Sequence, residues 1–444
     1  MSTRLIAAVA ALLAFALTGG AASAAQAPGK SQGKGGAQAA AQAAAPAQSN
    51  RPARHAPCVR GEADGFPCHR VDLLSYFWME EIGGSQVVGQ GRGSDVWGWE
   101  DPATRREYVI AGRENGTAFV DITDPKRPVY LANLPSASPQ NVIWRDIKVY
   151  EDHAFIVSEA LNHGMQVFDL TQLRSIDRSA APVNVAATAH YTGFGRAHNL
   201  NINEETGYAY AVGIREGIDC DHGMHMMDIS NPTTPVFAGC FAQDGYIHDT
   251  QCVVYRGADA RYLGREICFT ASPTPPGPHA VTIVDVTNKA NPVILSKTPY
   301  EGAAYSHQGW LTPNQEQFIF GDEGDEGAFG HNTRTLVFDV RNLESPAHIG
   351  THFGPTRAIN HNIYTENRWV YQSNYTAGLR ILDGRRVADG ILEEVAYFDT
   401  YPPHNNAVFG FGTWSNYAWF SSGVIAVHGY QGLWIVKARL GQQN

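Results

Sequence analysis

The chain has 444 residues, a net charge of −10, 45 glycines and six cysteines, and only 17% of its residues are charged. A chain of this length can bury a core of its own, which excludes a small module that depends on disulfides for its fold. Few charges, many glycines and 11% aromatic residues favour short strands joined by tight turns, and argue against helical or disordered structure.

The charge is divided unevenly along the chain. Residues 1–57 contain no acidic side chain and five basic ones: Arg4, Lys30, Lys34, Arg51 and Arg54. Residues 58–444 therefore hold 28 basic and 43 acidic groups, a net charge of −15. Because such a body repels phosphate, we do not expect nucleic acid as a partner.

The first 57 residues have the pattern of a leader and a linker. Arg4 precedes an apolar run over residues 5–17, and Ala22-Ser23-Ala24 resembles a cleavage site, so residues 1–24 are predicted to be a signal peptide. This run is shorter than the ~20 residues that span a bilayer. Residues 25–57 are rich in Ala, Gln, Gly and Pro, which is typical of a flexible linker. We expect an exported monomer, periplasmic or extracellular, with one domain over residues 58–444 and no transmembrane segment after cleavage.

The six cysteines are expected to form disulfides, because an even number in an oxidising compartment favours pairing over metal binding. Two pairs close short segments and the remaining two cysteines make the third pair: Cys58–Cys68, Cys252–Cys268 and Cys220–Cys240. Fifteen pairings remain formally open. The absence of any CxxC motif from the sequence disfavours thioredoxin-like chemistry.

One phrase recurs seven times along the chain. Its clearest copies are GTAFVDITDPKRPVYLANL from Gly116, GMHMMDISNPTTPVFAGCF from Gly223 and AVTIVDVTNKANPVILS from Ala280. Its aspartate recurs at intervals of 44 to 59 residues, at Asp121, Asp169, Asp228, Asp285, Asp339 and Asp383. A repeat of about fifty residues is in the range of a propeller blade.

Each repeat supports four strands. The recurring phrase is the third strand, and the proline after its Asp-centred turn suits a fourth strand at an outer edge. The last repeat lacks a fourth strand, and residues 71–82 are expected to supply it and so close the ring. We predict an all-β, seven-bladed propeller with four-stranded blades, with six or eight blades as alternatives.

Several phrases resemble the choice-of-anchor B family: CVRGEADGFPCHRVDLLS, WRDIKVYEDHAFIVSE, HGMQVFDL, AHNLNINEETGYAYAVG, YSHQGWLT and the repeated VDITDP. The resemblance runs from about Cys58 to the end and implies a secreted bacterial propeller of LVIVD-type repeats with unassigned biochemistry. Members of this family carry different C-terminal surface anchors. Because no such segment follows the repeats here, we expect release or periplasmic residence.

Histidine occupies one position of the first strand in four consecutive repeats: His198, His248, His307 and His361. Arg145 stands at this position in the preceding repeat. Because first strands line the channel of a propeller, the histidines are expected to form an arc around one mouth. The next position holds a second polar layer, with Asp95, Asp146, Asn199, Asp249, Gln308 and Asn362. Glu159 and Glu323, at the ends of second strands, are placed to approach the histidines from behind.

Two interpretations of this arc remain open. An inherited histidine can simply bond to the backbone of the next blade. Alternatively, converging neutral imidazoles form a site for one transition metal (Fe, Cu, Mn or Zn), with orienting carboxylates behind them at Asp146, Asp249, Glu159 and Glu323. The arrangement is similar to the four axial histidines of the seven-bladed, iron-binding carotenoid-cleaving dioxygenases, and by this analogy the metal interpretation predicts an oxidase or oxygenase.

Two further patterns bear on function. The segment GDEGDEGAFGHN crowds four acidic residues whose spacing does not match an EF-hand: Asp322, Glu323, Asp325 and Glu326. We expect a solvated surface loop there, with calcium-dependent adhesion as an alternative. Five tryptophans are able to stack sugars, although their repeat spacing favours core positions: Trp97, Trp99, Trp310, Trp414 and Trp419.

Nucleophilic and phosphate-binding chemistry has little support, because no G-x-S-x-G or P-loop motif occurs. We therefore favour a binding or interaction module that presents its loops to a small-molecule or surface ligand. A metal-dependent oxidase or oxygenase is the alternative.

Overall fold

The aspartate of the repeated phrase forms the same local turn six times: it ends the third strand in five repeats, and in the sixth it precedes a break in the register of a longer strand. Its Oδ1 accepts a hydrogen bond of 2.9–3.0 Å from the backbone N–H two residues later, in Asp121–Thr123, Asp169–Thr171, Asp228–Ser230, Asp285–Thr287, Asp339–Arg341 and Asp383–Arg385. This Asx turn redirects the chain toward the next strand. The seventh copy has Lys437 at this position, and its fourth strand comes from elsewhere in the chain.

The structure, a computed structural model, describes residues 54–84, 92–273 and 279–441. The predicted signal peptide and most of the predicted linker lie outside the described residues. Seven four-stranded antiparallel units, numbered here as blades 1 to 7, follow one another along the chain.

From the inner to the outer strand, blade 1 consists of β4 (Gly93–Glu100), β5 (Glu107–Arg113), β6 (Gly116–Asp121) and β7 (Val129–Pro135). Blade 2 consists of β8 (Arg145–Tyr150), β9 (His153–Ser158), β10 (Met165–Asp169) and β12 (Ala189–Tyr191). Blade 3 consists of β14 (Asn199–Asn203), β15 (Tyr208–Val212), β17 (Met224–Asp228) and β18 (Val236–Phe241). Blade 4 consists of β19 (Asp249–Val254), β20 (Glu266–Ser272), β21 (Ala280–Asp285) and β22 (Val293–Pro299).

Blade 5 consists of β23 (Ser306–Leu311), β24 (Gln317–Asp322), β25 (Arg334–Asp339) and β26 (Ala347–Phe353). Blade 6 consists of β27 (Ile363–Glu366), β28 (Trp369–Ser373), β29 (Leu379–Arg386) and β30 (Ile391–Phe398). Blade 7 consists of β31 (Thr413–Tyr417), β32 (Ile425–Gly429), β33 (Gly432–Ala438) and β3 (Val71–Trp78).

The connections contain the remaining short elements. The additional strands are β1 (Glu62–Ala63), β2 (Phe66–His69), β11 (Val183–Asn184), β13 (Phe194–Arg196) and β16 (Arg215–Gly217). The helical turns are η1 (Met79–Ile82), η2 (Leu170–Ser175), η3 (Cys220–His222), α1 (Asp325–Phe329) and η4 (Val387–Asp389). None of the helices in the described ranges has the length and apolar character needed to cross a lipid bilayer.

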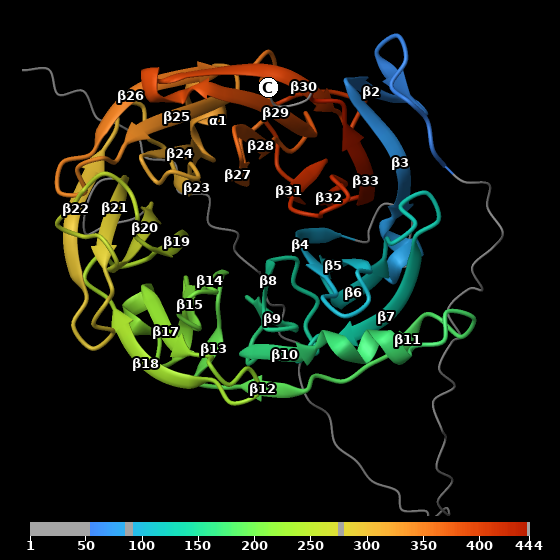
Figure 1. Ribbon diagram of the computed structural model, residues 1–444, viewed down its shortest axis with the longest axis horizontal. Coiled ribbons are helices and arrows are strands. Elements are labelled where there is room, and N and C mark those ends of the chain that lie inside the picture. Colours follow the sequence, from blue (N-terminus) through green and yellow to red (C-terminus); the bar gives the residue numbers. More distant parts are fainter. Residues whose placement is uncertain (1–53, 85–91, 274–278, 442–444) are drawn as a thin grey trace, which may run out of the picture. The chain divides into compact units, whose positions relative to one another are not determined.

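The blades form a closed ring with the first strand of each blade toward the centre (Figure 1). Neighbouring first strands contact one another in the cyclic order β4, β8, β14, β19, β23, β27, β31 and back to β4. Large apolar side chains fill the space between successive sheets, as where Phe119 of β6 meets Phe168 of β10 with ring centroids 4.6 Å apart. The predicted seven-bladed propeller is confirmed.

The ring closes through the N-terminal strand, as predicted. Strand β3 pairs antiparallel with β33, from Val71 opposite Ala438 to Trp78 opposite Gly432. The strand ends four residues before the predicted boundary. The reason is local, because the carboxylate of Glu81 accepts a hydrogen bond from the backbone N–H of Trp78 at 2.8 Å and the chain turns into η1.

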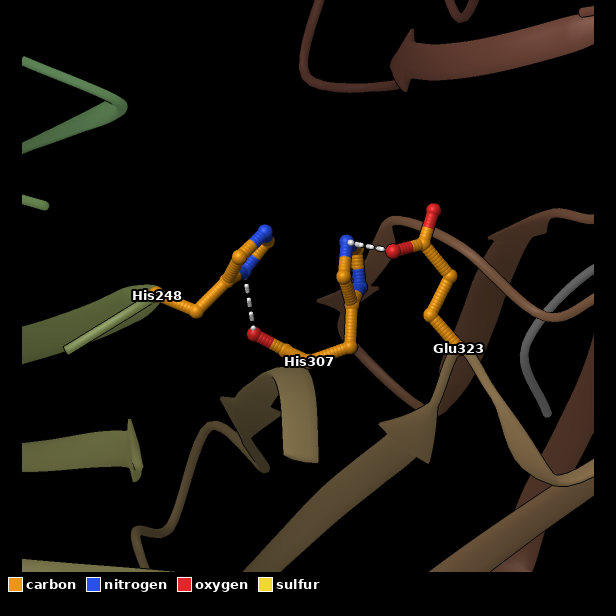
Figure 2. A group of neighbouring side chains, drawn as sticks. All are labelled: His248, His307 and Glu323. Atoms are coloured by element: carbon orange, nitrogen blue, oxygen red, sulfur yellow. Dashed lines mark hydrogen bonds and ion pairs between the residues drawn. The ribbon is translucent and has the colours of Figure 1, made fainter. Parts of the chain in front are cut away.

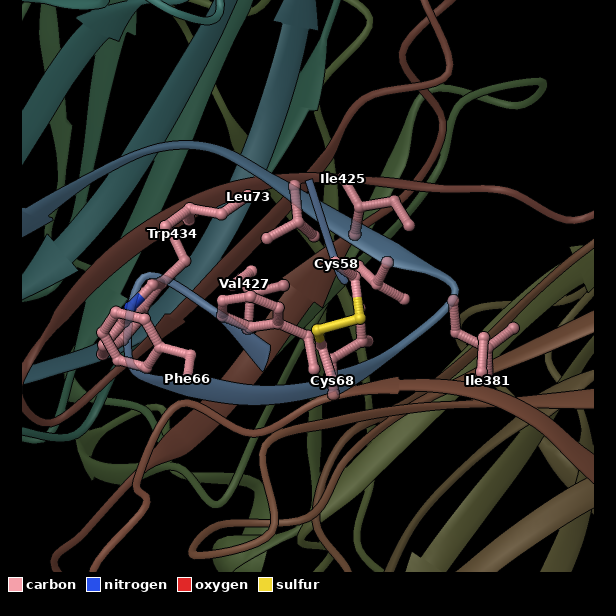
Figure 3. Close-up of a cluster of buried hydrophobic side chains, with 14 of the residues drawn as sticks. Cys58, Phe66, Cys68, Leu73, Ile381, Ile425, Val427 and Trp434 are labelled. Carbon is pink, nitrogen blue, oxygen red and sulfur yellow. A yellow bond between two sulfur atoms is a disulfide. The ribbon is translucent and has the colours of Figure 1, made fainter. Parts of the chain in front are cut away.

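The residues before β3 pack on blades 6 and 7 and belong to the fold (Figure 3). Strand β2 pairs with β30, and Phe66 packs against Phe398 and Trp434 with ring centroids 5.5 and 6.1 Å away. Ala56, in the segment assigned to the linker from sequence, bonds with Leu73 of β3 in both directions at 3.0 Å. The ordered contacts thus begin before residue 58.

The three disulfides are those expected from sequence: Cys58–Cys68, Cys220–Cys240 and Cys252–Cys268. The last pair joins directly opposed residues of β19 and β20. No free cysteine occurs among the described residues, and the disulfide at Cys220 rules out thiolate metal ligation there.

Candidate metal centre on the channel axis

The first strands place three layers of side chains along the channel. The first layer, at one mouth, consists of Ser94, Arg145, His198, His248, His307, His361 and Trp414. The second layer, one residue later, consists of Asp95, Asp146, Asn199, Asp249, Gln308, Asn362 and Ser415. The third layer, two residues further on, consists of Trp97, Lys148, Asn201, Gln251, Trp310, Tyr364 and Tyr417.

The four histidines of the first layer form a continuous arc, as predicted from sequence. Adjacent ring centroids are 4.2 Å apart for His198 and His248, and 4.4 Å apart for both His248–His307 and His307–His361. All four residues are buried, with 1% to 9% of their surface exposed. Blades 3 to 6 therefore bring their imidazoles into one group.

Backbone carbonyls of the next blade fix the orientation of two of these rings. Nδ1 of His248 donates to the carbonyl of His307 at 2.9 Å, and Nδ1 of His361 donates to the carbonyl of Trp414 at 2.6 Å. A proton on Nδ1 leaves Nε2 with its lone pair, the form of imidazole that binds metals. Bonding to the neighbouring blade and metal ligation are thus compatible in the same residue.

Glu323, directly after β24, completes the group. Its Oε2 lies 3.6 Å from Nε2 of His307, and its Oε1 lies 3.5 Å from Nε2 of His361. Figure 2 shows the Glu323 carboxylate facing the His307 ring, with His248 on the other side. Potential ligand atoms of His248, His307 and Glu323 all lie within 4.8 Å of one another.

These separations fit a shared metal better than direct hydrogen bonds. A hydrogen bond between nitrogen and oxygen is usually about 2.9 Å long. Two ligands bound at about 2.1 Å in a tetrahedral site stand about 3.4 Å apart, close to the observed 3.5 and 3.6 Å. In addition, Nδ1 of His307 is buried without a hydrogen-bond partner among the described residues. The donor set of imidazole nitrogens with one carboxylate suits Fe, Cu, Mn or Zn.

Burial sets the protonation of the group. It lowers the pKa of His361 to about 3 and holds the pKa values of His248 and His307 well below their usual range, so these imidazoles are neutral near pH 7. Burial also raises the pKa of Glu323 to about 8, although the hydrogen bond from Tyr375 at 2.6 Å opposes this rise. A bound cation would favour the charged carboxylate.

His198 stands at the end of the arc with a carboxylate of its own. Its Nδ1 lies 2.6 Å from Oε1 of Glu159, which directly follows β9 of blade 2. Burial opposes ionisation of Glu159, but the hydrogen bond with His198 and the nearby Arg215 outweigh it and lower the pKa of Glu159. Glu159 and Glu323 thus both approach histidines from neighbouring elements, as predicted.

Asp146 and Asp249 do not orient the histidines, contrary to the sequence-based expectation. Oδ2 of Asp146 accepts a hydrogen bond from the N–H of Leu200 at 2.6 Å, which joins blade 2 to blade 3, and its Oδ1 accepts from Nζ of Lys148 at 2.7 Å. Asp249 accepts from the N–H of Thr250 at 2.6 Å, and burial raises its pKa to about 8. Carbonyls already occupy Nδ1 of His248 and His361, so the second layer mainly joins blades and holds Lys148.

The acidic segment after β24 is buried, which corrects the prediction of a solvated loop. Asp322, Asp325 and Glu326 are 0% exposed. Asp322 accepts hydrogen bonds from the N–H groups of Ala304, Tyr305 and Gly324, and Asp325 accepts one from Arg334. Protein donors thus occupy both oxygens of Asp322 and one oxygen of Asp325, whereas Oδ1 of Asp325 and Oε2 of Glu326 have no hydrogen-bond partner among the described residues. Because these carboxylates are buried and burial raises the pKa of Glu326 to about 10, the segment gives no support to calcium-dependent adhesion at the surface.

Sequence reasoning missed Tyr375, which donates a hydrogen bond to Glu323 and packs against His361, with ring centroids 4.7 Å apart and the rings tilted by 54°. Tyr375 follows the second strand of blade 6, the same location in the repeat that holds Glu159 in blade 2 and Glu323 in blade 5. Comparison of these loop positions between repeats is the signal that would have found it.

Comparisons with known proteins support the fold and the repeat. Residues 195–242, which include blade 3, match the family model of the LVIVD repeat. This match supports an LVIVD-type propeller, while membership of the choice-of-anchor B family is not confirmed. Comparison with curated proteins finds no match.

Among solved structures, that of U3-55K is similar at a TM-score of 0.50 and 10% identity, covering 82% of this chain and 98% of that one. A protein from Lactobacillus plantarum has a TM-score of 0.48 and 12% identity, covering 76% and 88%. Hydrazine synthase of Kuenenia stuttgartiensis has a TM-score of 0.48 and 9% identity, covering 75% and 93%. At 10% identity, the similarity to U3-55K shows a shared fold only. Nothing is inferred from the other two structures, whose TM-scores are below 0.5.

Proposed function

We propose that this chain is an exported binding propeller whose axial histidine group holds one divalent transition metal ion. The supporting observation is that potential ligand atoms of His248, His307 and Glu323 lie within 4.8 Å of one another. Nε2 of His361 also approaches Glu323, at 3.5 Å. The neutral state of the imidazoles adds to it, because metals bind deprotonated nitrogen.

Each protein group has a separate role in such a site. The carbonyls of His307 and Trp414 hold the rings of His248 and His361 so that Nε2 faces the centre. Tyr375 holds the carboxylate of Glu323 in place. A bound Fe, Cu, Mn or Zn ion would supply a Lewis acid or, for the redox-active metals, an electron carrier.

Binding is favoured over catalysis at this centre. The four histidines are at most 9% exposed, whereas a catalytic metal needs a coordination position that substrate or water can reach. An oxidase or oxygenase acting through the same residues is the second candidate, and turnover of a small molecule that is lost in the variants below would favour it.

The test is elemental analysis of untagged protein purified without added metal. We expect about one equivalent of a single transition metal. His248→Asn and His361→Asn should lose it, because the Asn amide can replace Nδ1 as donor to the next blade but offers no Nε2. His428→Asn is a matched control, since His428 is equally buried and donates from Nδ1 to the carbonyl of Ser94 outside the cluster.

A wild-type protein with well under one equivalent of metal would contradict the proposal. So would variants at His248 and His361 that keep the metal content of His428→Asn.

Export and membership of the choice-of-anchor B family form the finer part of the proposal. Three disulfides support export, because disulfides persist in oxidising compartments. Expression of the full chain in a Gram-negative host, followed by fractionation and N-terminal sequencing, should find a mature protein that starts after Ala24. Retention of the uncleaved chain in the cytoplasm would contradict export.

A further inference from the structure

The mouth of the channel opposite the histidines is lined by aromatic and amide side chains. The third layer supplies Trp97, Trp310, Tyr364 and Tyr417 to this mouth, and Trp419 joins them with ring centroids 5.2 to 6.1 Å from its neighbours. Tyr364 is buried, whereas Trp310 and Trp419 keep part of their surface exposed. The tryptophans assigned to the core from sequence are therefore divided between core and channel mouth.

Two adjacent cavities of about 280 Å³ each open at this mouth. Trp97, Lys148 and Asn201 line the first, and Leu311, Thr365 and Trp419 line the second. Both cavities are lined by Gln251, Val253, Trp310 and Gln315. Each is near the lower end of the roughly 300–1,000 Å³ of small-molecule sites, so the pair suits a short ligand that contacts Trp310.

Two amide side chains provide unused donors in these walls. Oδ1 of Asn201 accepts from the N–H of Cys252 at 2.9 Å, and Oε1 of Gln251 accepts from the N–H of Leu311 at 2.7 Å. Each bond joins neighbouring blades and fixes the amide group. The amide nitrogens of Asn201 and Gln251 donate no hydrogen bond within the described ranges, and both residues line the first cavity.

The charges at this mouth do not favour an anion. The ammonium group of Lys148 lies 2.7 Å from Asp146 and 3.5 Å from Asp95, so carboxylates below the cavity already neutralise it. At the rim, Arg256 is paired with Glu205, while Glu204 adds a carboxylate. Uncharged polar groups and an apolar face would therefore increase the affinity of a ligand at this mouth, whereas negative charge would not.

We propose that this mouth binds a neutral oligosaccharide, with one sugar ring stacked on Trp310 and hydroxyl groups that accept hydrogen bonds from the amides of Asn201 and Gln251. A pyranose ring combines an apolar C–H face with outward hydroxyls, the chemistry that an aromatic wall with fixed amide donors recognises. The second cavity accommodates the adjoining sugar ring. The site is separate from the proposed metal centre.

The test is calorimetric titration of the full-length mature protein with maltotriose, cellotriose, xylotriose and triacetylchitotriose, each up to about 10 mM. We expect saturable binding of at least one of them. Trp310→Ala should weaken it about tenfold or more, because aromatic residues at the centre of a site supply much of the binding energy. Asn201→Asp and Gln251→Glu keep the acceptor that joins the blades and remove the donor, so they should weaken binding with the fold intact.

Trp144→Ala is the matched control, because Trp144 lies before β8 at the histidine mouth and is 45% exposed. It should leave the affinity unchanged, and so should His248→Asn, which separates this site from the metal proposal. The inference is overturned if none of the four sugars binds. It is also overturned if binding persists unchanged in Trp310→Ala, or is lost equally in Trp144→Ala.

Discussion

A buried histidine in this ring has two nitrogens with different tasks. In His248 and His361, Nδ1 bonds to a carbonyl of the next blade, while Nε2 is directed to the channel axis, where that of His361 lies 3.5 Å from Glu323. His428 of β32 makes the same kind of bond to Ser94 and so joins blade 7 to blade 1. The inherited structural role and a ligand role therefore do not compete. The difference between these residues is whether Nε2 has neighbours that also bind metals.

For a single residue, we predict that burial of His428 lowers the free energy of unfolding as the pH falls. Burial lowers its pKa from 6.5 to about 4 in the folded state. Between these values the unfolded chain binds a proton that the folded chain does not, so stability falls as the pH drops from 6.5 to 4 and is constant above 6.5. The loss from this residue is about 3 kcal/mol.

Urea titrations of wild type and His428→Asn over this pH range measure the effect. The variant should show a shallower pH dependence of the unfolding free energy. His55→Asn, at an exposed position, should match the wild-type slope. Equal slopes in wild type and His428→Asn would contradict the assignment.

Among the elements, the third strand of blades 1 to 5 ends at one aspartate. The Asx turn at Asp228, for example, satisfies the N–H of Ser230 at 2.9 Å, a group that has left the ladder of blade 3. Repetition of this turn explains why aspartate recurs in six copies even though their spacing varies. The residue marks a turn and not a site.

We predict that Asp228→Ala lowers the free energy of unfolding by about 1 kcal/mol, the usual contribution of one such local acceptor. Asp228→Asn retains the side-chain acceptor and should recover most of this loss. Chemical denaturation of the three proteins at neutral pH makes the comparison. An unchanged midpoint for Asp228→Ala would show that the turn forms without its aspartate.

For the whole molecule, closure depends on a segment far from its partner in sequence. Strand β3 completes blade 7, and β1 and β2 extend blade 6, so the N-terminal segment holds two blades together. Phe66 and the Cys58–Cys68 disulfide lie in the cluster that this segment forms with those blades. Without β3, the strand β33 would present an unpaired edge.

We predict that deletion of residues 1–78 yields a protein that aggregates or unfolds at much lower temperature, because an open ring exposes an edge strand and the core between blades 1 and 7. Deletion of residues 1–53 retains every described contact and serves as the control. Size-exclusion chromatography and thermal melting monitored by circular dichroism compare the two. A soluble, monomeric product with an unchanged melting temperature from the longer deletion would contradict this account of closure.

The sequence by itself determined the features that depend on local or periodic order. The repeat predicted the seven blades, the Asp-centred turns and the closing strand. Short segments between cysteines predicted two of the disulfides, and the two remaining cysteines gave the third. The position of histidine in each copy predicted the arc, because equivalent positions on first strands must meet at the channel.

Only the tertiary structure decided which of these residues have chemically useful neighbours. Glu323 and Tyr375 reach the histidines from loops that differ between repeats, and burial turned the acidic segment around Asp325 inward. The cavities around Trp310 likewise join side chains from all seven blades. These contacts join different strands and loops, many of them in different blades, and no local pattern encodes the distances between them.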